Sequence, residues 1–129
     1  MLRTTAYAFL AANLLHTADH FRQGLGDLSW EILAAGTSLT IFAVIVVVLV
    51  NRDHPRAPLF AAVVGVSGAL GIIAAHIAPN WSALSDSYTE GDQDVVSWLV
   101  VLIEISTAAA LGFAGLRALR APSPTPRQA

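Results

Sequence analysis

The sequence predicts an all-α fold: an integral membrane four-helix bundle with both termini in the cytoplasm. Composition is the first indication, since 55% of the 129 residues are hydrophobic and 12% are charged, against about a quarter charged in soluble domains. Four apolar runs are the second, at about residues 4–22, 32–50, 57–78 and 95–116. Each approaches the ~20 residues that cross ~30 Å of hydrocarbon as a helix. The third is the placement of arginine.

Arginine placement predicts the orientation. All seven basic residues are Arg, and most lie in segments that share one side of the membrane in a chain with four spans: Arg3, Arg52, Arg56, Arg117, Arg120 and Arg127. Only Arg22 lies on the other side. Because cytoplasmic segments carry the excess of Lys and Arg, both termini are expected in the cytoplasm of a multi-pass cell-membrane protein. The acidic connection 79–94 is then expected outside.

The element boundaries follow from turn and capping residues. Glycines at 24 and 26 end the first run, and Ser29 can cap the second, with Trp30 at the membrane interface. Residues 1–120 are predicted to form one transmembrane domain. The Pro-rich residues 121–129 are predicted to be a disordered cytoplasmic tail, because they lack apolar side chains to bury.

Small residues predict which helices pack closely. Ala61, Gly65 and Ala69 follow each other at four-residue spacing in the third run, and Ala108 and Gly112 do so in the fourth. Such small-xxx-small stripes let helix backbones approach each other in a membrane. The third and fourth helices are therefore expected to pack against each other.

Composition also excludes several classes of protein. The chain has no cysteine, which rules out disulfides, thiolate metal sites and a thiol nucleophile. The formal net charge of −2 argues against a nucleic-acid partner, which would require a basic surface. The partner that the composition does predict is the lipid bilayer.

A polar stripe near the end of the first run is the most unusual feature. His16 and His20 are four residues apart, so they lie one turn apart on the same helix face. Asn13, Asp19 and Gln23 fall with them in a sector roughly 120° wide. In a membrane such a stripe must face the inside of a bundle, where partners offset its desolvation.

Two further ionisable residues are expected in the same outer half of the bundle. His76 lies near the end of the third run, and Glu104 lies about 14 Å inside the fourth, among apolar residues. A charge in mid-helix costs at least a few kcal/mol in a membrane, so Glu104 indicates function. A single interfacial histidine is more often a snorkelling residue than a ligand. Asp19 can also simply pair with Arg22, and the acids of residues 79–94 are read as solvated loop residues.

The first functional interpretation is a metal site. His16, His20 and His76 are the predicted ligands, with Glu104 and Asp19 as catalytic or supporting carboxylates. Imidazoles and a carboxylate suit a divalent metal such as Zn or Fe, which could activate water for chemistry on a lipid or small molecule. The run from His16 to His20 resembles one histidine box of integral-membrane fatty-acid hydroxylases and desaturases. That resemblance covers five residues, and the chain has four His, too few for the di-iron centre of those enzymes.

Two other interpretations remain open. A four-helix chain with a buried Glu resembles, in architecture, the small multidrug-resistance exporters, which dimerise and exchange protons for substrate. Here Glu104 lies in the fourth helix rather than the first, and it could form a proton relay with His16. Alternatively, the protein could be a non-enzymatic subunit that holds haem b between histidines, or an assembly partner in a larger membrane complex.

Overall fold

The computed structural model describes residues 1–26 and 28–121, and it is all-α, as expected. The helices are α1 (Leu2–Gln23), α2 (Trp30–Asn51), α3 (Ala57–Ile72) and α4 (Val95–Arg120), and a π-helical turn, η1 (Ile73–Ile77), continues α3. The four predicted helices are therefore confirmed within that part of the chain. The tail predicted to be disordered lies, apart from Ala121, outside the described residues.

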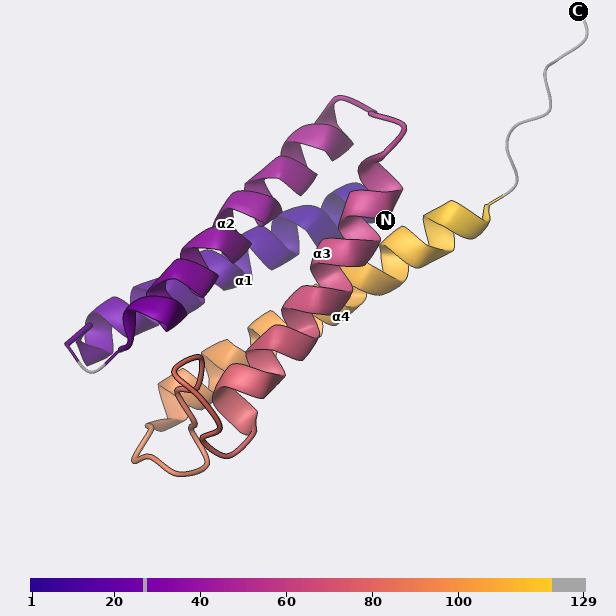
Figure 1. Cartoon of the computed structure of the whole chain (residues 1–129). Helices are drawn as coiled ribbons and strands as arrows, with labels where there is room; N and C mark the ends of the chain where they lie inside the picture. The colour runs from indigo at the N-terminus through magenta and orange to yellow at the C-terminus, as the bar shows by residue number, and fades with distance from the viewer. Residues whose placement is uncertain (27, 122–129) are drawn as a thin grey trace, which may run out of the picture.

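The helices run up and down in sequence order (Figure 1). One end of the bundle holds the connections 24–29 and 78–94, and we call it the loop end. The other end holds Met1, the short α2–α3 turn and the end of α4. Three segments are long and apolar enough to cross a membrane, namely Trp30–Asn51, Ala57–Ile77 and Val95–Arg120. The more polar α1 is of similar length, at 22 residues.

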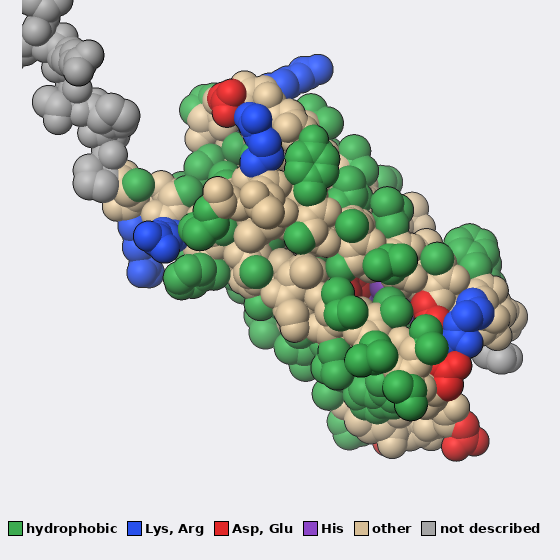
Figure 2. Space-filling view, turned by 180° about the vertical axis from the view of Figure 1, so that it is seen from behind, with side chains coloured by type: hydrophobic (Ala, Val, Ile, Leu, Met, Phe, Trp, Pro, Cys, Tyr) green, Lys and Arg blue, Asp and Glu red, His purple; other side chains and the backbone are tan. Residues whose placement is uncertain are grey.

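Apolar side chains cover the middle of the molecule, and charged side chains gather at its two ends (Figure 2). Buried polar residues lie beneath this surface, in the loop-end half of the bundle: Asn13, His16, Asp19, His76, Ser87, Ser97 and Glu104. The opposite half is filled by an apolar core that includes Phe9, Val46 and Leu111, each fully buried. This polarity fits a membrane protein with a polar site at one depth.

Close packing of α3 on α4 is confirmed and depends on glycine. A Cβ at Gly65 would overlap the backbone of Gly112, and one at Gly112 would lie 2.9 Å from the backbone nitrogen of Val66. Gly115 forms a further contact of this kind with Ala62. Because these contacts are between backbones, no side-chain rotation can relieve a larger residue.

Side-chain caps start the two helices that follow the loops. The Ser29 hydroxyl accepts a hydrogen bond from Ile32 N at 3.2 Å, as its position in the sequence predicts. Asp94 caps α4 in the same way, with its carboxylate accepting from Ser97 N at 3.0 Å. Both helices therefore begin at the loop end with an acceptor for their free N–H groups.

The helix α2 packs closely along its second half and at Ile32 near its start, but not between them. In its second half Ala43, Val46 and Val50 are buried at helical spacing. In its first half residues 33–38 are all exposed, so no face of this segment contacts the bundle closely. Figure 1 shows the result: α2 and α3 are near each other at the turn that joins them and diverge toward the loop end.

Candidate metal centre

Three histidine side chains meet between α1 and the end of α3. The ring centroids of His16 and His20 are 4.6 Å apart, those of His16 and His76 are 4.8 Å apart, and those of His20 and His76 are 5.5 Å apart. One nitrogen from each ring lies within 4.8 Å of the others. His16 and His76 are buried, and His20 is partly buried. The structure thus places together all three residues that the sequence suggested as ligands.

Glu104 lies directly behind His16. Its Oε2 hydrogen-bonds His16 Nδ1, and its Oε1 accepts from Asn13 Nδ2 at 2.8 Å. Asn13 Oδ1 in turn accepts from the Thr40 hydroxyl at 2.6 Å. The Glu104 side chain is 1% exposed, so this chain of bonds across α4, α1 and α2 satisfies a carboxylate that water cannot reach. It also fixes the orientation of the His16 ring.

The C-terminal turn of the third helix holds the loop over the site. Helix ends leave carbonyl groups without intrahelical partners, and the π-turn is closed by Ala78 N bonding Ile73 O at 3.0 Å. Three carbonyls are taken by groups of residues 78–94: Ala74 O accepts from Trp81 Nε1 at 2.8 Å, Ala75 O from Asp86 N at 2.9 Å, and His76 O from Tyr88 N at 2.8 Å. The loop is therefore positioned by backbone bonds next to His76.

This positioning brings Asp86 against two of the histidines. Its Oδ2 lies 3.5 Å from His76 Nδ1 and 3.9 Å from His20 Nδ1, and its backbone oxygen lies 3.1 Å from His76 Nδ1. Burial raises the pKa of the Asp86 carboxyl above its ordinary value. Asp86 is therefore not simply the solvated loop acid expected from the sequence. No periodic pattern could place it, because a loop residue's position depends on the carbonyls that hold the loop.

Tyr88 covers the other side of the cluster. Its hydroxyl lies 3.4 Å from His16 Nε2, and its ring contacts that of His76, with centroids 4.8 Å apart. The side chain is 2% exposed, and burial raises the pKa of the phenol to about 12. A neutral hydroxyl is therefore present beside His16 throughout the ordinary pH range.

Asp19 is turned toward α4 rather than toward the histidines. Its carboxylate accepts from Arg22 Nε at 2.7 Å and from Gln23 Nε2 at 2.6 Å. Arg22 also donates to both oxygens of Asp94, at 2.8 and 3.0 Å, and to the Ser97 hydroxyl at 3.0 Å. The pairing of Asp19 with Arg22 that the spacing allows is thus present. It belongs to a clamp between the end of α1 and the start of α4.

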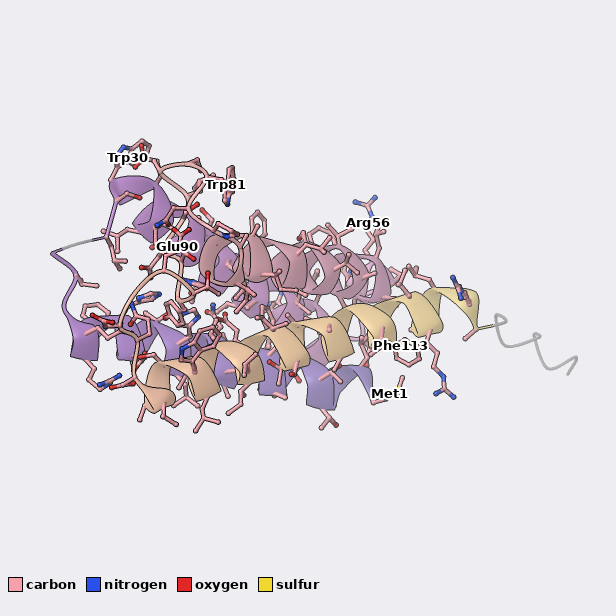
Figure 3. The ribbon with its side chains drawn as sticks, turned by 90° about the horizontal axis from the view of Figure 1, so that it is seen from below. Met1, Trp30, Arg56, Trp81, Glu90 and Phe113 are labelled. Atoms are coloured by element: carbon pink, nitrogen blue, oxygen red, sulfur yellow. The ribbon has the colours of Figure 1, made fainter. Side chains whose placement is uncertain are left out.

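A cavity of about 730 Å³ adjoins the histidines. His16, His20, His76 and Glu104 line it at one place, and apolar residues of α2 and α3 line most of the rest. Figure 3 shows the two ends of the bundle between which it lies: Trp30, Trp81 and Glu90 at the loop end, and Met1, Arg56 and Phe113 toward the other.

The chain matches no model of a protein family, no curated protein and no solved structure. The function of the site therefore has to be inferred from its own geometry.

Proposed function

We propose that this protein is a membrane protein that holds one divalent transition-metal ion, zinc or iron, at His16, His20 and His76. The observation that supports this most is the orientation of the rings. For two of the rings Nδ1 has a hydrogen-bond partner, Glu104 Oε2 for His16 and the Asp86 backbone oxygen for His76. Asp86 Oδ2 lies 3.9 Å from Nδ1 of the third, His20. An Nδ1–H that donates to a carboxylate or carbonyl leaves Nε2 as the ligand atom, an arrangement common among metal-binding histidines. On His16 the Tyr88 hydroxyl, 3.4 Å from Nε2, would have to give way to the ion.

The distances are compatible with an ion after a small adjustment. Ligand nitrogens about 2.1 Å from a tetrahedral zinc are about 3.4 Å apart, and the present nitrogens lie within 4.8 Å. The nitrogen separations exceed that spacing by at most about 1.4 Å, which rotation of the three side chains would have to close. Three neutral imidazoles leave a fourth position open, as in catalytic zinc sites. At such a position the metal could polarise a bound ligand or activate water.

Haem b fits less well than a single ion. A haem iron with two axial histidines needs their rings on opposite faces of the porphyrin. Here the rings of His16 and His20 are stacked on each other, and the ring of His76 is edge-on to that of His16. Three rings in mutual contact leave no slot for a macrocycle between any two of them.

Transport driven by Glu104 has less support than metal binding. Both carboxylate oxygens already have partners in His16 and Asn13. Among the described residues, the buried side chains in the half of the bundle away from the loop end are apolar. A proton or substrate that left Glu104 in that direction would meet no buried polar side chain that could accept it. We therefore assign Glu104 the role of orienting His16, and Asp19 that of holding α1 to α4.

We further propose that all four helices cross the membrane, with both termini in the cytoplasm. The helix α1 packs against α4 and α2 in the same bundle, and its polar residues Asn13, His16 and Asp19 face inward and are buried. The arginines of the two termini and the α2–α3 turn supply the charge asymmetry. The metal site then opens on the extracytoplasmic half of the membrane.

Metal content of purified protein tests the metal proposal. The wild-type chain, stripped with a chelator and reloaded with Zn²⁺, Fe²⁺ or Co²⁺, should retain about one ion per chain after desalting. Co²⁺ should also give the visible absorption bands of a tetrahedral site. His16→Ala, His20→Ala and His76→Ala should each lose the ion. His54→Ala is the matched control, because His54 lies in the exposed α2–α3 turn. Equal retention by all four variants would refute the site.

A further inference from the structure

The cavity beside the histidines has one polar region and long apolar walls. The polar region is formed by Asn13 and Glu104 together with the three histidines. The walls come from residues 33 and 35–42 of α2, from residues of the last turns of α3, and from Ala74 and Ala75 of η1. Its volume of about 730 Å³ is within the ~300–1,000 Å³ usual for pockets that hold one small ligand. The shape and polarity match a single amphiphilic molecule.

The cavity is open because small residues face it without being packed. Small residues usually mark close helix contacts in membranes, and Gly65 and Gly112 behave in that way. In contrast, a Cβ added at Gly36 or Gly71 would meet nothing within 4 Å, although both glycines line the cavity. Ala35 lines it as well. The space between the loop-end halves of α2 and α3 is therefore left free by residues too small to fill it.

The chemistry of the polar region indicates the sign of the ligand's head group. Glu104 is the one acidic side chain that lines the cavity among the described residues, and His16 and Asn13 already occupy its oxygens. Asp86 lies against His76 and His20 but does not line the cavity. A cationic head inside the cavity would therefore meet no carboxylate without a partner. The imidazoles, and a metal ion held by them, favour an anionic oxygen donor instead.

We propose that the cavity binds one long-chain carboxylate, with its alkyl chain between α2 and α3 and its carboxylate at the histidine cluster. The proposal rests on the proposed metal site, because the ion supplies the counter-charge and the open position for the head. Both wall helices are apolar enough to span a membrane, so the chain could enter sideways from the lipid.

Two neighbouring alanines of α2 provide a matched test. Ala35 lines the cavity, whereas Ala34 is equally exposed and does not. Protein in detergent micelles, loaded with Zn²⁺, is titrated with radiolabelled palmitate, with methyl palmitate as the uncharged analogue. We expect saturable binding of one palmitate per chain and at least tenfold weaker binding of the ester. Ala35→Leu and Gly71→Leu should each weaken palmitate binding at least tenfold, while Ala34→Leu leaves it unchanged.

The outcomes separate this proposal from the metal site itself. Ala35→Leu and Gly71→Leu should keep the metal content of the wild-type protein, because neither residue touches the histidines' ligand atoms. Equal binding by the Ala34→Leu and Ala35→Leu variants, or equal binding of acid and ester, would overturn the proposal and indicate a groove filled by bulk lipid only. If removal of the metal leaves palmitate binding unchanged, the cavity still binds the alkyl chain. The proposed contact between the head group and the ion is then overturned.

Discussion

At the scale of single residues, the orientation of the histidine rings depends on the groups that contact their Nδ1 atoms. Glu104 is the clearest case, because it is fully buried and the only described partners of its carboxylate are His16 and Asn13. The sequence indicated its importance from the cost of a charge among apolar residues. Its role as the orienting group for one ring depends on the distance between α1 and α4, which no local pattern encodes.

Glu104→Gln should weaken metal binding without removing a ligand. The amide is nearly the same size, but it replaces a carboxylate oxygen that holds the His16 Nδ1 proton. Loss of such a supporting partner typically lowers metal affinity about 10–100-fold, and competition with a chromophoric chelator would measure it. Glu31→Gln, in the first turn of α2, is the control and should retain wild-type affinity. Unchanged affinity in Glu104→Gln would show that His16 does not need this partner.

The lowered pKa of the Asp94 carboxyl predicts that the stability of the fold depends on pH. Hydrogen bonding from Ser97 N, together with Arg22, lowers the pKa of its carboxyl from 3.8 to about 2 in the folded protein. A carboxyl with a lowered folded pKa stabilises the fold above its unfolded pKa, and that stabilisation is lost as the pH falls from about 4 to 2. Asp94→Asn keeps a capping oxygen but removes the charge. It should lower the thermal midpoint in detergent at pH 6 and have little effect at pH 2.

The comparison variant for this measurement is Asp92→Asn, which changes an exposed acid of the same loop. Its thermal midpoint should follow that of the wild-type protein at both pH values. If Asp94→Asn and Asp92→Asn have the same effect, the clamp between Arg22 and Asp94 contributes nothing to stability.

At the scale of elements, two glycines of α3 should respond oppositely to the same change. A leucine at Gly65 would overlap the backbone of α4, whereas a leucine at Gly71 would enter open space. Gly65→Leu should therefore destabilise the fold by at least the ~1–3 kcal/mol typical of overpacking. Gly71→Leu should be tolerated. Unfolding of both variants in a denaturing detergent would measure the difference, and similar midpoints would contradict the α3–α4 contact.

The elements also show where sequence patterns stop being informative. The four-residue spacing of His16 and His20, and of the small residues, predicts which residues share a helix face, because the helix period is fixed. The position of Asp86 could not be predicted, since it depends on which helix-end carbonyls the loop meets. The separation of α2 from α3 could not be predicted either, because the apolar residues in the first half of α2 lie all around the helix, with Thr37, Ser38 and Thr40 among them, and indicate no packed face.

At the scale of the whole molecule, single-cysteine labelling tests the proposed orientation. The natural chain has no cysteine, so each variant carries one reporter. Asp92→Cys lies in the connection 78–94, and Arg52→Cys lies at the α2–α3 turn; both positions are exposed. In intact cells a membrane-impermeant maleimide should label Asp92→Cys only, and both should react after lysis. Labelling of both, or of Arg52→Cys alone, would contradict four spans with cytoplasmic termini.

The half-packed helix α2 has a consequence for motion. One half of α2 is anchored by Ala43, Val46 and Val50, whereas residues 33–38 have few contacts to break. Segments with few buried contacts open at the lowest free-energy cost in a protein. The helix is therefore held near its start by the buried Ile32 and by the hydrogen bond from the Ser29 hydroxyl to Ala83 O, and along its second half by the core, while the segment 33–38 between them has room to move. If the cavity binds the proposed long-chain carboxylate, movement of this wall lets it take alkyl chains of different lengths while the head group stays at the histidines.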